Sequence, residues 1–298
     1  MKNKRSIVSN KIFRFFLGLI IAFVLLFLLF SQISFSELRK AIDSLSISIV
    51  LLGALIYFIA YLFRAARFRL ILQNKIDFSS SMAISMIHNL VVQVLPARTG
   101  ELSFLYLAKK RGIRGAEAAA TIIIARFFDL LVISFIFLVS ALFLENTPQI
   151  IKSIVVLVSS LIIIILLIMM TLAFFGSAYK KIMNRLLRRF IRYRIIKYFA
   201  EKMEEVISSF HVLKSRRMII YAFISSVIIW SLIYLMNYLI FYDIAGKVPI
   251  AFFSAGVSLT VIANVIPIQG LGNFGTHEAF WTIAFVALGL ELEIAILT

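Results

Sequence analysis

Five apolar runs are each long enough to cross a lipid bilayer, and they limit the fold more than any other feature of the chain. The runs are Ile12–Phe30, Ile47–Phe63, Ala119–Leu144, Ile150–Phe175 and Ile219–Tyr242. A helix rises about 1.5 Å per residue, so roughly 20 apolar residues span the hydrocarbon core. In lipid, a spanning segment must satisfy its own backbone polar groups, which a helix does. We therefore predict an all-α polytopic membrane protein, with one membrane domain over residues 1–298.

The charge of the chain fits this interpretation. The formal net charge is +17, but the Lys and Arg residues lie between the apolar runs, where they orient helices and meet anionic headgroups. We therefore do not expect nucleic acid as a partner. The chain has no cysteine, which excludes disulfides, thiolate chemistry and Cys-type metal sites. Its histidines, His88, His211 and His277, are far apart in the sequence, so we expect no metal and no cofactor.

The basic residues also predict the orientation, because short basic loops beside spans stay in the cytoplasm. The first run follows a cluster of Lys and Arg and is longer than the apolar part of a signal peptide. We interpret it as a retained first helix with a cytoplasmic N-terminus. The basic stretch 179–217 would then lie inside, either as an amphipathic helix on the inner leaflet or as a solvated connector. The predicted location is the cytoplasmic membrane, with multiple passes.

Two further apolar segments are interrupted by proline, glycine and polar residues. Ser81–Leu95 is followed by Pro96, and Ile250–Ile268 contains Pro267 and precedes several glycines. Basic stretches flank the first segment on both sides, which places both of its ends in the cytoplasm. The second segment follows a loop that the same rule places outside. We predict two re-entrant, Pro/Gly-broken helical segments that enter from opposite sides of the membrane.

The two halves of the chain have the same order of elements, which predicts an inverted repeat. Repeat A covers about 12–144 and repeat B about 150–298, with Pro96 and Pro267 in corresponding positions 171 residues apart. This offset would move the run Ala119–Leu144 to 290–315, beyond Thr298. We therefore expect repeat B to lack its last helix.

The first break carries residues suited to a lipid headgroup. Two amides lie four residues apart on one helix face, and an arginine offers a planar guanidinium that fits phosphate. The proline and glycine end the helix and leave backbone groups available to bind a headgroup. The alternative is a juxtamembrane loop with ordinary headgroup-facing charges. The residues are Asn89, Gln93, Pro96, Arg98, Gly100 and Glu101.

The second break is richer in glycine. The glycines permit close backbone approach, and a helix that begins after them would direct its positive dipole end at a bound anion. We do not interpret it as a dinucleotide-binding loop, because no alternation of strands and helices surrounds it. The residues are Asn264, Pro267, Gln269, Gly270, Gly272, Gly275 and Glu278.

Arg126 and Asp129 lie well inside the run Ala119–Leu144. An ionisable residue at that depth costs about 3 kcal/mol or more and usually faces a polar cavity, so a functional role is the default. Their spacing of three also permits an ion pair on one helix face, with a purely structural role.

The segments Pro96–Glu101 and Pro267–Glu278, together with Arg64-Ala65-Ala66-Arg67, resemble the lysylphosphatidylglycerol synthase transmembrane, or flippase-like, family. The resemblance covers nearly the whole chain and implies a membrane domain that moves lipids. Gln269 departs from the pattern, which has a glycine there. The chain carries no soluble aminoacyl-transferase domain, so the resemblance is to a stand-alone member and implies translocation but not lipid synthesis.

Our leading hypothesis is a lipid translocase of the flippase or scramblase type. Its partner would be an anionic or aminoacylated phospholipid, or a polyprenyl-linked lipid. Two arginines would contact the headgroup, four amides would line the cavity, and two glutamates would tune its charge or bind a cationic headgroup. These residues are Arg98, Arg126, Asn89, Gln93, Asn264, Gln269, Glu101 and Glu278.

Two alternatives stay open from the residues. A membrane transferase could act on a lipid-linked substrate with Glu101 or Glu278 as its base, although no nucleophile stands beside a base in the sequence, which favours a transporter over an enzyme. A small-anion transporter is the second alternative. The sequence also leaves the oligomeric state open, a homo-oligomer included.

Overall fold

The computed structural model describes most of the chain between residue 31 and the C-terminus. The described residues are 20, 23–24, 26–28, 31–144, 149, 152–161, 163–164, 167, 171, 185, 205–207, 209–210, 215–265 and 271–298, without the side chains of 96–98 and 271. Pro267, Gln269 and Gly270 lie outside this part, as do most of the predicted first span and the basic stretch 179–217. Of the predicted span Ile150–Phe175, the main described portion is the helix Lys152–Leu161.

Three described helices are long and apolar enough to cross a membrane: α3 (Ile47–Ile71), α6 (Gly115–Leu142) and α9 (Arg216–Ala245). Each contains one of the predicted apolar runs or nearly all of it. No strand occurs among the described residues. The prediction of an all-α membrane protein is therefore confirmed.

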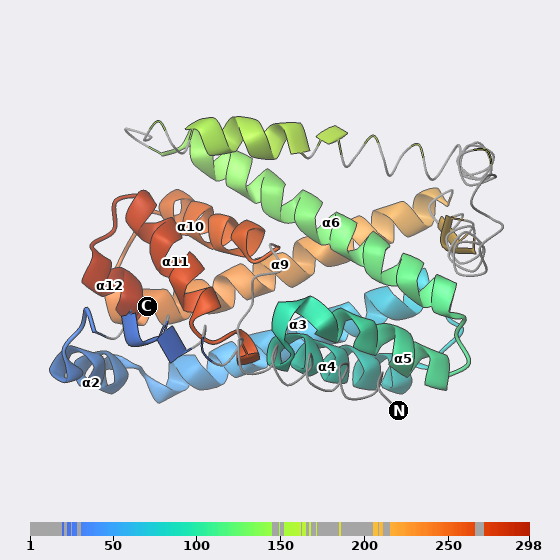
Figure 1. Ribbon diagram of the computed structural model, residues 1–298, viewed down its shortest axis with the longest axis horizontal. Helices are drawn as coiled ribbons and strands as arrows, with labels where there is room; N and C mark the ends of the chain where they lie inside the picture. The colour runs from blue at the N-terminus through green and yellow to red at the C-terminus, as the bar shows by residue number, and fades with distance from the viewer. Residues whose placement is uncertain are drawn as a thin grey trace, which may run out of the picture.

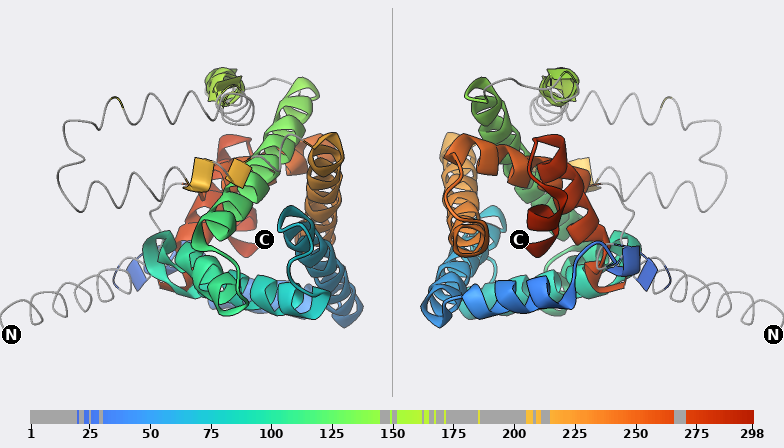
Figure 2. Two further views of the ribbon diagram at one scale, coloured as in Figure 1. Left: turned by 90° about the vertical axis from the view of Figure 1, so that its right-hand side faces the viewer. Right: turned by 90° about the vertical axis from the view of Figure 1, so that its left-hand side faces the viewer.

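Helices α3 and α9 run alongside each other through the molecule, and α6 crosses from one end to the other to contact α9 and α10 (Ile250–Ala263) (Figure 1). Seen along the long axis, α6, α9 and the layer of α4 and α5 lie like three sides of a triangle (Figure 2). The α3–α9 contact is close at Gly53, where an added Cβ would lie 3.4 Å from Met236. Small residues are what allow membrane helices to pack at such short range.

Each broken segment forms a helical hairpin. The first consists of α4 (Phe78–Val94), the 3₁₀ turn η1 (Pro96–Glu101) and α5 (Leu102–Lys110). Helix α4 ends because the residue before a proline avoids the α conformation, and Leu95 is extended, with φ −86° and ψ 133°. Helix α4 begins at an Asp77 cap, and the hydrogen bonds donated by Ser80 hold the pKa of Asp77 below its usual value.

The second hairpin consists of α10, the turn η3 (Leu271–Asn273) and α11 (Thr276–Ala287), followed by α12 (Leu292–Leu297). Gly272 and Gly275 have φ of 69° and 76°, which glycine adopts without steric cost. The hairpins approach from opposite ends of the molecule, and η3 contacts both α4 and η1 (Figure 1). Two opposed hairpins with touching tips agree with the predicted breaks, while the inverted repeat itself stays a prediction.

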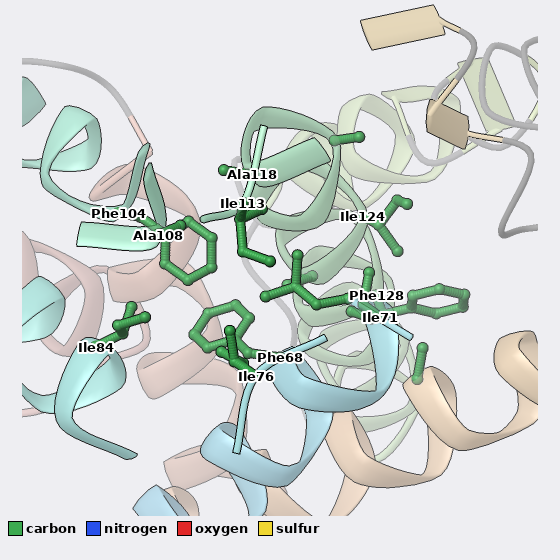
Figure 3. Close-up of a cluster of buried hydrophobic side chains, with 14 of the residues drawn as sticks. Phe68, Ile71, Ile76, Ile84, Phe104, Ala108, Ile113, Ala118, Ile124 and Phe128 are labelled. Atoms are coloured by element: carbon green, nitrogen blue, oxygen red, sulfur yellow. The ribbon is translucent and has the colours of Figure 1, made fainter. Parts of the chain in front are cut away.

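A cluster of buried side chains fixes the first hairpin to its neighbours. Phe68 of α3 packs on Phe104 of α5 with ring centroids 4.7 Å apart, and Ile84 and Phe128 add contacts from α4 and α6 (Figure 3). Because four helices share this cluster, α4 and α5 are held rigidly against α3 and α6. The polar residues on these helices are thereby held in fixed register.

The hydrogen bond between Tyr234 of α9 and Ser258 of α10 gives a test of the packing around the second hairpin. The two hydroxyl oxygens are 2.7 Å apart and buried. Tyr234→Phe is expected to lower the free energy of unfolding by about 1 kcal/mol, because Ser258 loses a buried partner. Tyr221→Phe on the same helix is the control, since that side chain is 54% exposed. Equal stability of both variants and the parent, in thermal unfolding of purified protein, would contradict this contact.

Candidate functional site

Charged and polar side chains of α3, α4 and α6 converge on one small cavity in the first half of the chain. The cavity has a volume of about 20 Å³, which is room for about one water molecule. A phosphate headgroup does not fit into that space unless the surrounding side chains move apart. The lining residues are Arg64, Arg67, Phe68, His88, Asn89, Ile122, Ala125, Arg126 and Asp129.

One ion pair in the cluster, Arg67–Asp129, is buried and bidentate. Arg67 of α3 donates to both carboxylate oxygens of Asp129 on α6, at 2.5 and 3.1 Å, and also to the hydroxyl of Ser226 on α9 at 2.6 Å. The Arg67 and Asp129 side chains are only 2% and 8% exposed. Bidentate guanidinium–carboxylate pairs combine strength with fixed geometry. This pair therefore ties the three spanning helices together.

The second ion pair is more accessible. Arg126 of α6 donates to Glu101 of η1 at 2.8 Å, and these side chains are 43% and 24% exposed. His88 of α4 lies on the other side of the carboxylate, with its Nε2 3.5 Å from Glu101 Oε2, and its Nδ1 is 2.9 Å from the Ser103 hydroxyl. Only one guanidinium nitrogen of Arg126 bonds to Glu101 here. An entering anion could therefore reach Arg126 without dismantling the helix packing.

Arg64 adds a third guanidinium to the cluster. It donates to the Asn89 side chain at 3.4 Å and lies 5.2 Å from the centre of the Tyr61 ring. Asn89 in turn donates to the Tyr61 hydroxyl at 2.5 Å. Among the described side chains, Arg64 has no ion-pair partner. In the described part of the chain, three guanidinium groups line the cavity, whereas Asp129 in its lining and Glu101, which is bonded to Arg126, supply two carboxylates. This excess of positive charge favours an anion.

Arg126 and Asp129, whose spacing permits an ion pair on one helix face, instead form two ion pairs with residues of other elements. Arg126 bonds to Glu101, and Asp129 bonds to Arg67. A spacing of three allows two side chains on one helix to meet, but a partner on a facing segment offers better hydrogen-bond geometry. Each residue therefore has its ion-pair partner on another element, although both belong to the same cluster.

The structure brings only some of the predicted site residues together. Asn89 and Arg126 line the cavity and Glu101 bonds to Arg126, whereas Gln93 is exposed on α4. Arg98 lies in η1, three residues before Glu101, and its side chain is outside the described part. Gly100 is buried against α4, where an added Cβ would lie 2.4 Å from the Val91 carbonyl oxygen.

The predicted residues of the second break form a separate group. The Asn264 amide lies 3.1 Å from Nδ1 of His277, at the start of α11. Glu278 follows, and its Oε2 is buried without a hydrogen bond among the described residues. Neither Asn264 nor Glu278 lines the cavity of the first half.

Sequence reasoning missed the direct role of Arg64 and Arg67 in this cluster. Both follow the predicted end of the second apolar run at Phe63, so the sequence pattern placed them in the basic stretch after that run. Helix α3 continues to Ile71 without a break, so these arginines lie on a spanning helix. The signal was available in their spacing of three, which places both on one helix face.

Comparison with known proteins identifies the family. Residues 15–298 match the family described as the lysylphosphatidylglycerol synthase TM region. No curated protein and no solved structure gives a match. The match covers almost the whole chain, including both hairpins and the cluster of arginines. This family supports a lipid-related role in the membrane. Because the match extends over nearly all of its residues, the chain belongs to the lysylphosphatidylglycerol synthase transmembrane region family.

Proposed function

We propose that this protein moves lipids with an anionic headgroup between the two leaflets of the cytoplasmic membrane. The observation that carries the proposal is the contrast between the two ion pairs. Arg67–Asp129 is buried and bidentate, whereas Arg126–Glu101 is partly exposed and uses a single guanidinium nitrogen. A carrier needs both kinds of pair, because one holds the helices in place and the other releases a charge for the headgroup.

The arrangement of the hairpins supports this proposal. Backbone that leaves the helical conformation inside a membrane is tolerated only where protein or a water-filled cavity surrounds it. The turns η1 and η3 at the tips of the two hairpins contact each other, so protein surrounds the non-helical backbone there. If the tips separate, the cavity at Arg126 would open between them. The headgroup could then pass through while the acyl chains stay in lipid, with the N-terminus in the cytoplasm as the basic residues predict.

Translocation assays with Arg126→Ala test the proposal. Purified protein in vesicles should move a fluorescent phosphatidylglycerol to the outer leaflet, where dithionite quenches it. The variant should fall to the rate of protein-free vesicles, because the headgroup loses its exchangeable cation. Lys109→Ala, which removes an exposed cation at the end of α5, should keep the parent rate.

Undiminished transfer by a folded Arg126→Ala protein would exclude this assignment. Uptake of radiolabelled phosphate without lipid movement would instead favour a small-anion transporter.

A further inference from the structure

The surroundings of Glu101 point beyond the binding of a headgroup. Its carboxylate stands between a permanent cation and a buried imidazole, with Arg126 at 2.8 Å and His88 Nε2 at 3.5 Å. His88 is 4% exposed, and its Nε2 makes no hydrogen bond among the described residues. A proton on Glu101 would give this nitrogen a donor. The site therefore has a place for one proton that the resting ion pair does not use.

An anion that binds Arg126 competes with Glu101 for the same guanidinium. Two anionic groups on one cation in a low-dielectric site repel each other, and such pairs are relieved when one of them takes a proton. The other carboxylate, Asp129, does not take up this proton, because Arg67 donates hydrogen bonds to both of its oxygens. Glu101 is the carboxylate whose partner the headgroup would take.

We propose that Glu101 is the proton-binding group of the transport cycle and that each anionic headgroup bound at Arg126 brings one proton to it. This inference rests on the proposed function and adds the coupling ion. In the resting state, the Glu101 carboxylate pairs with Arg126. The headgroup phosphate then replaces Glu101 as the partner of Arg126. A proton from the bulk solvent protonates Glu101, which donates a hydrogen bond to His88 Nε2. The net charge of the site is the same before and after, because one anion and one proton enter together.

The other groups around Glu101 do not replace it in this role. His88 comes from α4, Arg126 from α6, Arg64 from α3 and Arg98 from the same turn η1, while α5 contributes the neutral Ser103 and the residues of η3 carry no titratable group. An arginine side chain has no proton to exchange in this role, because a guanidinium is not deprotonated in proteins. Proton uptake on binding is therefore assigned to Glu101 rather than to His88, whose ring faces two cations across the same cavity.

Binding of a soluble short-chain phosphatidylglycerol tests the inference, since its phosphodiester keeps one negative charge over the pH range used. Titration calorimetry of the protein in zwitterionic nanodiscs, in buffers of different ionisation enthalpy, should show uptake of about one proton per bound lipid. The affinity should weaken by up to about tenfold for each unit of rising pH. In Glu101→Gln, proton uptake and pH dependence should both disappear, whereas Glu293→Gln, an exposed acid on α12, should behave like the parent.

The outcomes separate the two proposals. Proton uptake that persists in Glu101→Gln would assign the proton to another group and overturn the inference. Lipid binding and translocation without proton uptake in the parent would overturn the coupling alone and leave translocation standing. A parent protein that moves no anionic lipid at any pH would overturn the proposed function, and the coupling with it.

Discussion

Arg67→Ala is expected to lower the free energy of unfolding by about 3–5 kcal/mol, because it leaves the Asp129 carboxylate charged and buried without its partner. The guanidinium bonds both oxygens of Asp129 and the hydroxyl of Ser226, so one substitution breaks contacts from α3 to α6 and α9. Thermal unfolding of purified protein in one detergent, followed through the two tryptophans, measures the loss. Translocation should fall with it, since these helices frame the cavity.

Two controls separate the loss of the charge pair from loss of packing. Arg67→Met combined with Asp129→Leu removes both charges at similar volume and should recover most of the stability. A double variant as unstable as Arg67→Ala would contradict the electrostatic explanation. Arg39→Ala breaks the Arg39–Asp43 pair, whose side chains are 76% and 70% exposed, and should change stability by less than about 1 kcal/mol.

Gly100→Ala is expected to disrupt the tip of the first hairpin and to abolish translocation. A Cβ at this position would lie 2.4 Å from the Val91 carbonyl oxygen and 2.5 Å from the Val92 Cα. Both atoms belong to the α4 backbone, so no side chain can rotate away, and the turn η1 must move. Overpacking of this kind costs about 1–3 kcal/mol or more. The displacement would also carry Glu101 away from Arg126, because Glu101 is the next residue.

Gly115→Ala is the matched control for this prediction. Gly115 is the first residue of α6, and nothing lies within 4 Å of an added Cβ. Alanine there should be neutral or stabilise the protein by up to about 1 kcal/mol, because it restricts the unfolded chain. Equal unfolding temperatures and equal lipid transfer for the two variants would show that the close approach at Gly100 does not constrain the hairpin.

Much of the fold could be predicted because its signals are local. The apolar runs within Ile47–Ile71 and Gly115–Leu142 predicted spanning helices, since the bilayer sets how many apolar residues a span needs. The break after α4 could also be predicted, because Pro96 cannot continue a helix and restricts the residue before it. The ends of the helices are not set by composition alone, and α3 continues beyond the predicted end at Phe63 to include Arg64, Arg67 and Arg69.

The sequence by itself therefore determined that this is a helical membrane protein, where its first hairpin breaks and which family it belongs to. Only the tertiary structure decided the charge partners. The spacing of Arg126 and Asp129 permitted an ion pair on one helix, whereas in the packed structure Arg126 pairs with Glu101 and Asp129 pairs with Arg67. The physical reason is that a guanidinium fork needs a carboxylate facing it in its own plane. Which carboxylate does so depends on how α3, α6 and η1 approach one another, and local sequence patterns do not contain that information.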